Sequence, residues 1–131
     1  MLPRMRRSYS VALAALVMLA LVPGVAQAAE KSYVRDPLTS KLAQKPKKLN
    51  FRDVDLTSLR WVHWGWSKAI ARGNANLLIC EPSCAEGRRV RGKVRVVISK
   101  RVTEGDKRVY QCIAGRITGV PRAYSRISWM C

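Results

Sequence analysis

The stretch RVRGKVRVVISKRV, residues 89–102, decides the predicted fold class. Basic side chains alternate with apolar residues or glycine along its first eight residues, which is the period-two pattern of a half-buried β-strand. The apolar face would hold Val90, Val94, Val96 and Ile98. The opposite face would hold Arg89, Arg91, Lys93 and Arg95. We therefore expect a strand that packs one face against a core and exposes a row of cations.

Shorter strand patterns lie on both sides of this stretch. Glu104–Lys107 is a hairpin turn signal, and Arg108–Ile117 follows it as the return strand. The other candidate strands are Leu59–Gly65, Ala75–Cys80 and Ala123–Cys131, while Trp66–Arg72 could form one helical turn. Five short strands with Gly and Pro between them predict an all-β fold, a small antiparallel barrel or sandwich over residues 51–131.

The first 28 residues have the three parts of an export signal peptide. Arg4, Arg6 and Arg7 form a positive start, Val11–Val22 is an apolar run of 12 residues, and Ala26-Gln27-Ala28 is a cleavage pattern. A membrane span needs about 20 residues, so a signal peptide is favoured over an uncleaved anchor or a buried helix. Its removal takes away three of the 25 basic residues and none of the eight acids, which leaves a charge of +14. We expect a protein that is secreted or associated with the cell envelope.

Residues 29–50 are polar and carry Pro37, Pro46 and a group of lysines. The segment has no sustained apolar period and cannot bury enough surface to offset chain entropy. We therefore predict a flexible basic linker. Its lysines would be either a solvated tail or a polyanion-binding arm, and the candidates for such an arm are Lys41, Lys45, Lys47 and Lys48.

Four cysteines in a short exported chain predict two disulfides, with three ways to pair them. A disulfide needs Cα atoms about 4.4–6.8 Å apart, whereas residues four apart on an extended strand lie roughly 13 Å apart. Pro82 indicates the turn that would bring Cys80 and Cys84 together. We therefore favour the pairs Cys80–Cys84 and Cys112–Cys131, the second of which would tie the chain end to a central strand.

Three other uses of the cysteines are disfavoured. A zinc site of Cys80, Cys84, Cys112 and His63 would need an unusual CxxxC hairpin and free thiols in an exported protein. A redox pair would favour CxxC before a helix N-terminus, and a catalytic Cys–His pair would need a spare cysteine. We predict no metal and no cofactor.

Residues 61–66, WVHWGW, hold three of the four tryptophans. Such a cluster stacks on sugars or bases, or forms part of the core. We expect Trp61 and Trp129 in the core. On a strand, Trp64 and Trp66 would face away from Trp61, which makes them the candidates for stacking on a ligand.

Three motifs follow one another along the chain: W-x-x-W-G from Trp61, A-x-x-x-G from Ala69, and C-x-P-x-C-A-x-G from Cys80. Their order resembles a group of small secreted bacterial proteins of unknown function. The resemblance covers about half of the mature chain and implies export and a β domain, without any chemistry. The basic segment and the Cys112/Cys131 pair depart from the pattern of that group.

Catalysis has little support in the sequence. The chain has one histidine, and its acid pairs Asp53/Asp55 and Glu104/Asp106 lie in no known acid/base motif. No serine stands in a G-x-S-x-G context. We therefore predict that the protein is not an enzyme.

A formal charge of +17 is the strongest functional signal. Such a charge favours anionic partners outside the cell. The chain also has fewer acidic residues than a surface whose charges serve only solubility would carry. We expect a binding module for anionic envelope or extracellular polymers, without nucleic-acid sequence specificity. The alternatives are a protein-interaction or inhibitor-like domain that uses the loop Glu81–Arg89, and a cationic antibacterial protein with a membrane surface as its partner. A solvated basic face without a ligand is the remaining interpretation.

Overall fold

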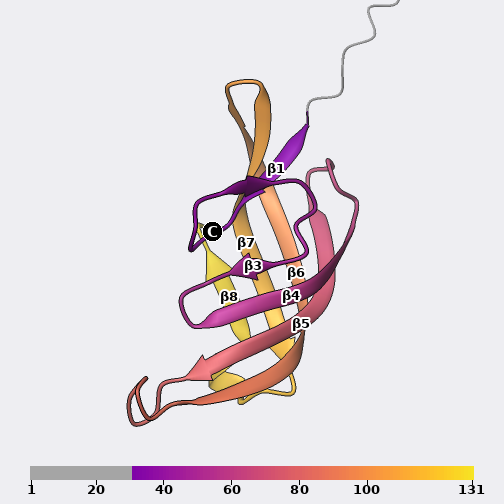
Figure 1. Cartoon of the computed structure of the whole chain (residues 1–131). Coiled ribbons are helices and arrows are strands. Elements are labelled where there is room, and N and C mark those ends of the chain that lie inside the picture. The colour runs from indigo at the N-terminus through magenta and orange to yellow at the C-terminus, as the bar shows by residue number, and fades with distance from the viewer. Residues whose placement is uncertain (1–30) are drawn as a thin grey trace, which may run out of the picture.

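The computed structural model describes residues 31–131, which form one strongly curled sheet (Figure 1). The strands of this part of the chain are β1 (Ser32–Arg35), β2 (Leu42–Ala43), β3 (Leu49–Asn50), β4 (Val54–Val62), β5 (Ala69–Ile79), β6 (Arg88–Glu104), β7 (Lys107–Thr118) and β8 (Arg126–Trp129). Their order is β2-β1-β7-β6-β5-β4-β3, and β8 pairs with β7 beside β1. The signal peptide predicted for residues 1–28, and residues 29–30, lie outside the described residues.

The predicted all-β class is confirmed, and the sheet curls into a half-barrel. Nearly all strand pairs are antiparallel, and the exception is β1, which pairs with β7 in parallel. The described residues form eight strands where the sequence predicted about five, because the N-terminal segment adds three. One short 3-10 turn, η1 (Arg122–Tyr124), precedes β8. Within residues 31–131 no helix is long and apolar enough to cross a membrane.

β6 is the strand predicted from the opening stretch, extended by one residue at its start and two at its end. Val94, Val96 and Ile98 are buried, as their alternation predicted. The hairpin to β7 has the predicted position, since Glu104 pairs with Lys107 across the two-residue turn Gly105-Asp106. Gly105 adopts a φ of 62°, which glycine reaches without the steric cost of a side chain.

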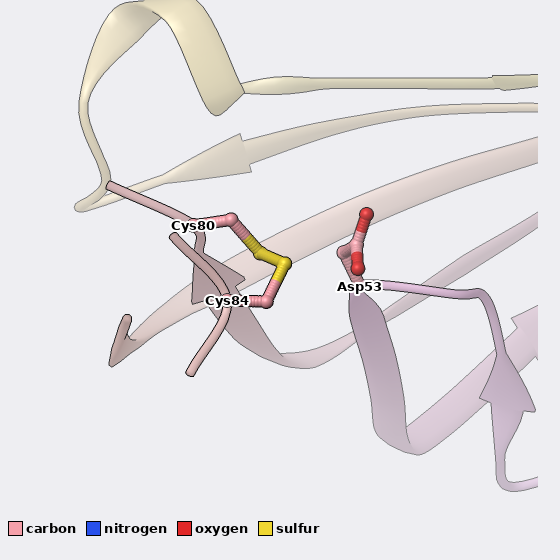
Figure 2. A group of neighbouring side chains, drawn as sticks. All are labelled: Asp53, Cys80 and Cys84. Carbon is pink, nitrogen blue, oxygen red and sulfur yellow. A yellow bond between two sulfur atoms is a disulfide. The ribbon is translucent and has the colours of Figure 1, made fainter. Parts of the chain in front are cut away.

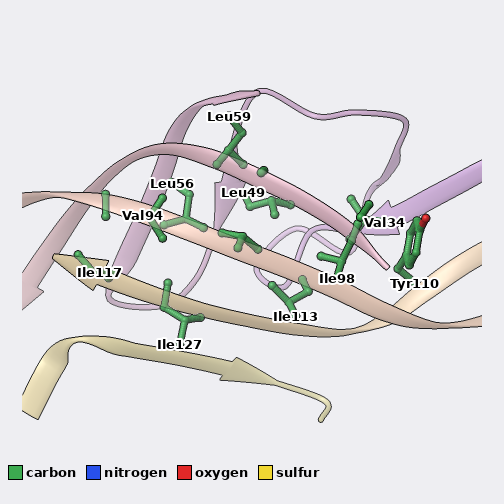
Figure 3. Close-up of a cluster of buried hydrophobic side chains, with 14 residues drawn as sticks. Val34, Leu49, Leu56, Leu59, Val94, Ile98, Tyr110, Ile113, Ile117 and Ile127 are labelled. Carbon is green, nitrogen blue, oxygen red and sulfur yellow. The ribbon is translucent and has the colours of Figure 1, made fainter. Parts of the chain in front are cut away.

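The core lies inside the curl of the sheet (Figure 3). Alternate residues of β4 to β8 point into it, because successive side chains of a strand face opposite sides. Its large members from these strands include Leu56, Leu59, Ile98, Tyr110, Ile113, Ile117 and Ile127. Val34 of β1 and Leu49 of β3 complete it and are almost fully buried.

The prediction of a flexible linker over residues 29–50 is wrong for the described residues 31–50. β1 pairs with β7, and β3 pairs with β4. The carboxylate of the buried Asp36 accepts hydrogen bonds from the backbone N–H groups of Leu38, Thr39 and Asn50 at 3.0, 2.8 and 2.8 Å. Burial by itself raises the pKa of Asp36, but these hydrogen bonds outweigh it and lower the pKa below its usual value.

β4 departs from simple alternation, because a bulge interrupts its pairing with β5 between Thr57 and Arg60. Ser58 adopts a positive φ of 53°, so Leu56 and Leu59 both face the core although they are three residues apart. On β5, Gly73 makes room for this bulge: a Cβ there would lie 2.6 Å from the carbonyl oxygen of Thr57.

Three predicted strands need correction at their ends. The strand predicted over Ala75–Cys80 begins earlier, at Ala69 of β5, and the strand predicted over Ala123–Cys131 is shortened to β8, Arg126–Trp129. β4 ends at Val62 instead of Gly65, because His63 and Gly65 take positive φ values of 58° and 88° and turn the chain. The helical turn considered for Trp66–Arg72 is wrong, since β5 begins at Ala69.

Both predicted disulfides are present in the structure. Cys80 is bonded to Cys84 with Cα atoms 4.0 Å apart, and Cys112 to Cys131 with Cα atoms 4.6 Å apart. No free cysteine is found among residues 31–131. Disulfides of this kind are typical of oxidising compartments and not of the cytosol.

Candidate functional site

The face of the sheet opposite the core, called here the outer face, carries the predicted basic row on β6. Arg89, Arg91, Lys93 and Arg95 are all exposed, so the two faces of β6 were assigned correctly. The row is partly paired: an Arg89 guanidinium nitrogen lies 3.8 Å from the Asp55 carboxylate. The ammonium of Lys93 donates to the side-chain oxygen of Asn74 at 2.8 Å.

The register of the sheet creates a second line of cations that crosses β6 at Arg95. Arg95 stands directly opposite Arg72 on β5 and Arg116 on β7. Arg72 in turn stands opposite Arg60, and Arg116 opposite Arg126. This line is called here the arginine rung, and its members, one on each of five neighbouring strands, are Arg60, Arg72, Arg95, Arg116 and Arg126.

All five rung arginines are exposed, and acids are absent from their neighbourhood on the sheet. None of the ion pairs or hydrogen bonds found in residues 31–131 involves a rung guanidinium. Next to the arginine rung, on one side, lies a parallel line of paired residues that is apolar except for its last member: Val62, Ile70, Val97, Ala114 and Ser128. The neighbouring line of paired residues on the other side consists of Thr57, Asn74, Lys93 and Thr118. The arginine rung is therefore a band of uncompensated positive charge.

One open hollow lies on this band, and a second lies beside it. The larger, of about 800 Å³, is lined by Arg72, Lys93, Arg95 and Arg116 above the apolar side chains of Val97 and Ala114. The second, of about 660 Å³, shares Lys93 and Thr118 with it and continues toward Asn76 and Arg91. The first hollow is therefore lined by three rung arginines and Lys93, whereas the only cations that line the second are Arg91 and Lys93.

The lysines predicted to form an arm belong to the folded domain. Lys41, Lys45, Lys47 and Lys48 are exposed, but the segment that carries them is held to the sheet. The Leu59 N–H donates to the Lys47 carbonyl at 3.0 Å, and the Trp61 indole N–H donates to the Pro46 carbonyl at 2.7 Å. These lysines therefore add fixed surface charge and cannot reach for a ligand as a flexible chain would.

The division of the tryptophans between core and surface differs in part from the prediction. Trp61 and Trp129 are half-buried and pack against the core, as expected. Trp64, predicted to face away from Trp61, instead packs edge-on against it with ring centroids 5.1 Å apart. Its indole N–H donates to the Ser32 carbonyl at 3.2 Å, so Trp64 holds β1 to the sheet and is a poor candidate for stacking.

Trp66 is the exposed member of the cluster, with 65% of its surface accessible. Its ring lies 4.7 Å from that of the exposed His63. The backbone beneath is fixed, because the buried Tyr110 hydroxyl donates to the Trp66 carbonyl at 2.6 Å and accepts from the Gly65 N–H at 3.0 Å. Burial raises the pKa of Tyr110, which keeps this hydroxyl protonated at neutral pH.

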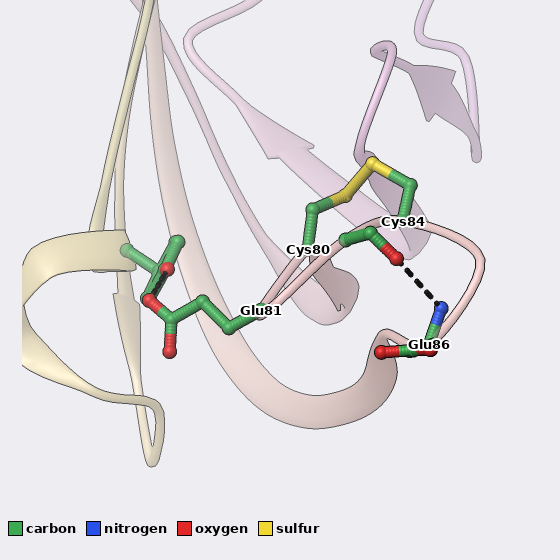
Figure 4. The surroundings of a disulfide bond; sticks show 6 residues. Cys80, Glu81, Cys84 and Glu86 are labelled. Atoms are coloured by element: carbon green, nitrogen blue, oxygen red, sulfur yellow. Dashed lines mark hydrogen bonds between the residues drawn. A yellow bond between two sulfur atoms is a disulfide. The ribbon is translucent and has the colours of Figure 1, made fainter.

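The loop after β5 is closed by the Cys80–Cys84 disulfide (Figure 4). The Glu81–Pro82 peptide bond is cis. The Tyr124 hydroxyl donates to the Glu81 carboxylate, and this hydrogen bond raises the pKa of Tyr124. The Glu86 N–H donates to the Ser83 hydroxyl at 3.3 Å. The loop is thus exposed and held at both ends.

Asp53 lies close to both sulfur atoms of this disulfide (Figure 2). Asp53, Cys80 and Cys84 form the one group of three His, Cys, Asp or Glu side chains in the described residues that lie close enough together to hold a metal ion. The two sulfurs are bonded to each other and offer no thiolate, and His63 is no part of the group. The alternative zinc site of Cys80, Cys84, Cys112 and His63 is therefore wrong.

Comparisons with protein-family models, with curated proteins and with solved structures found no match to this chain. The resemblance to a group of small secreted proteins consequently stays a prediction. Nothing in these comparisons indicates catalysis. The fold and the outer face together define a small disulfide-bonded β domain with a cationic sheet surface.

The arginine rung is the feature that sequence reasoning missed. Its members are separated by 10 to 23 residues along the chain, and nothing in their spacing marks them as a set. The hairpin between β6 and β7 was predicted, and its register alone would have placed Arg95 opposite Arg116. The other positions depend on the bulge in β4 and on the loops before β6 and β8.

Proposed function

We propose that the protein is a secreted, non-catalytic binding module for anionic polymers of the cell envelope or its surroundings. One observation carries the proposal: the outer face gathers exposed cations along β6 and across five strands, and the guanidiniums of the rung have no acidic partner. A basic surface that served solubility alone would intersperse acids among its bases. The two disulfides agree with export, since cytosolic thiols are kept reduced.

Ionic contacts to a polyanion release counterions, so the affinity should fall steeply as salt rises. We expect the protein to bind immobilised heparin and anionic wall material and to elute late in a salt gradient. Replacing Arg89, Arg91, Lys93 and Arg95 by glutamine should move elution to much lower salt. The fold should survive this change, because all four side chains are exposed.

A matched control removes the same number of charges elsewhere, by replacing Lys41, Lys45, Lys47 and Lys48 with glutamine. These lysines are exposed and lie on the segment around β2 and β3. The proposal expects this variant to elute closer to wild type than the β6 variant does. If the two variants elute together, only the total charge matters and the outer face is merely a solvated surface.

A second candidate function has one specific observation in its favour. The loop Glu81–Arg89 is exposed and cross-linked by Cys80–Cys84, and the hydrogen bond between Tyr124 and Glu81 holds it further. A rigid, protruding loop loses little entropy on binding, which suits an inhibitor-like or protein-interaction domain. A stoichiometric protein partner whose binding is abolished by changes at residues 81–87, before β6 begins, and is insensitive to the β6 variant, would favour this function over polymer binding.

A further inference from the structure

Five arginines on five neighbouring strands stand in one line across the outer face. We infer that this arginine rung is the binding site for a linear polymer of phosphate groups without aromatic bases, and that the polymer lies across the strands instead of along β6. This inference rests on the proposed function and narrows it to one ligand class and one orientation.

The dimensions of the rung suit a chain molecule. Neighbouring strands lie about 4.7–4.9 Å apart, so five strands place the outermost arginines of the rung roughly 19 Å from each other. Along β6, by contrast, alternate residues stand about 6.6–6.8 Å apart, and the row is partly neutralised by the Asp55 carboxylate beside Arg89. The rung therefore offers the denser and less compensated line of charge.

The chemistry of the rung favours phosphate. All five members are arginines and none is a lysine, and the planar guanidinium donates paired hydrogen bonds that match phosphate oxygens. A phosphate within a chain has two free oxygens, so it can accept from two neighbouring guanidiniums at once. The cationic hollow at Arg72, Lys93, Arg95 and Arg116 provides room for such a chain.

The two lines of residues beside the arginine rung argue against a nucleic acid and against a lipid bilayer as the ligand. Neither contains an aromatic side chain on which a base could stack, and single-stranded nucleic acids rely on such stacking. The apolar side chains of the line that begins at Val62 are shorter than the arginines beside them, and only Val62 among them is exposed, whereas Ile70, Val97 and Ala114 are half-buried. They would not reach past the guanidiniums into the acyl region of a membrane.

In the free protein, repulsion between the rung arginines destabilises the fold, and a bound anion would relieve this repulsion. Like charges directly opposite each other on a sheet are destabilising, and the rung contains four such pairs in succession. Folding alone would favour alternating charges or neutral side chains at these positions. A polyanion converts each repulsive pair into a shared contact.

The test uses linear inorganic polyphosphate and the whole protein, with affinity measured across a salt series. One double variant removes two rung charges, Arg72→Gln with Arg116→Gln. The control removes two charges from the row, Arg89→Gln with Arg91→Gln. Loss of Arg89 also frees Asp55, so the control overstates any contribution of the row. Near-ultraviolet circular dichroism checks that both variants are folded.

The rung variant should reduce the slope of log affinity against log salt by about 1.4, since each phosphate contact on a flexible strand contributes about 0.7. The control should change the slope far less. Arg72→Lys with Arg116→Lys keeps the charge but loses the planar fork, and should lose affinity while keeping most of the slope. Affinity should rise with polyphosphate length until the chain spans the rung.

Equal slopes for the rung variant and the control would overturn the inferred orientation. A dT oligonucleotide or anionic lipid vesicles with the same affinity and the same dependence on Arg72 and Arg116 would overturn the ligand class. Retention on heparin without binding of polyphosphate would also overturn it, yet would leave the proposed function standing. Failure to bind any of these polyanions would reject the proposed function itself.

Discussion

Replacing Arg95 with glutamine should stabilise the free protein at low salt, although it removes a charged surface residue of the longest strand. Arg95 stands opposite Arg72 on one side and Arg116 on the other, and its guanidinium has no ion-pair partner in the described structure. Glutamine keeps part of the apolar stem and removes both repulsive contacts. The gain is a property of the folded state, because the unfolded chain does not hold these arginines side by side.

The magnitude follows from the number of pairs. A cross-strand pair is worth roughly 0.2–1 kcal/mol, so relief of two repulsive pairs that share one exposed charge should contribute about 0.5–1 kcal/mol. For a domain of this size that corresponds to an increase in Tm of roughly 3–6 °C. Screening shortens the range of these repulsions from about 10 Å at 0.1 M salt to about 3 Å at 1 M. The gain should therefore shrink strongly at high salt.

Calorimetry at low and at high salt measures this effect directly. Arg91→Gln is the matched control, because Arg91 lies on the same face of the same strand but stands opposite Asn76. We expect little change in its Tm under either condition. The reasoning is refuted if Arg95→Gln behaves as Arg91→Gln does, or if its gain in Tm is as large at high salt as at low salt.

Three further predictions concern stability. Asp36→Ala should lower the free energy of unfolding by about 2–4 kcal/mol, because the backbone N–H groups of Leu38, Thr39 and Asn50 lose a charged acceptor. Urea titrations should show this difference shrink below pH 3.8, since the lowered pKa of Asp36 contributes stability above that pH and loses it as pH falls through the folded value. Replacing Cys112 and Cys131 together by serine should cost about 3 kcal/mol, judged from a sequence separation of 19. Deleting residues 31–48 should abolish the cooperative thermal transition, because Val34 leaves the core.

The basic N-terminal segment shows where composition misleads. Residues 31–50 look like a linker because their apolar residues have no period, but Val34 and Leu49 each fill a separate place in the core. Asp36 fixes the turn between them through several hydrogen bonds to one carboxylate. A segment that docks through two anchors and one buried acid leaves no periodic signal in the sequence.

The tryptophan cluster shows a failure of a different kind. Parity along a strand placed Trp64 on the face opposite Trp61, which holds only while the backbone stays extended. Positive φ values at His63 and Gly65 turn the chain instead, and the two rings then pack together. Such a turn at a histidine depends on contacts from β1 and β7, which local propensity does not contain.

The sequence by itself indicated the all-β class, the position and facing of β6, the hairpin that follows it and the favoured pairing of the cysteines. These features depend on patterns within short stretches: a period of two, a Gly-Asp turn, and a proline between Cys80 and Cys84, a pair that leaves Cys112 and Cys131 to bond to each other. The arginine rung was decided only by the tertiary structure. The register in which the strands pair determines which residues stand in one line across them. The register of these five strands depends on the bulge at Ser58, on every loop length and on the burial of one face. Residues far apart in the chain become neighbours there because the pairing of strands, and not their sequence spacing, sets which side chains meet.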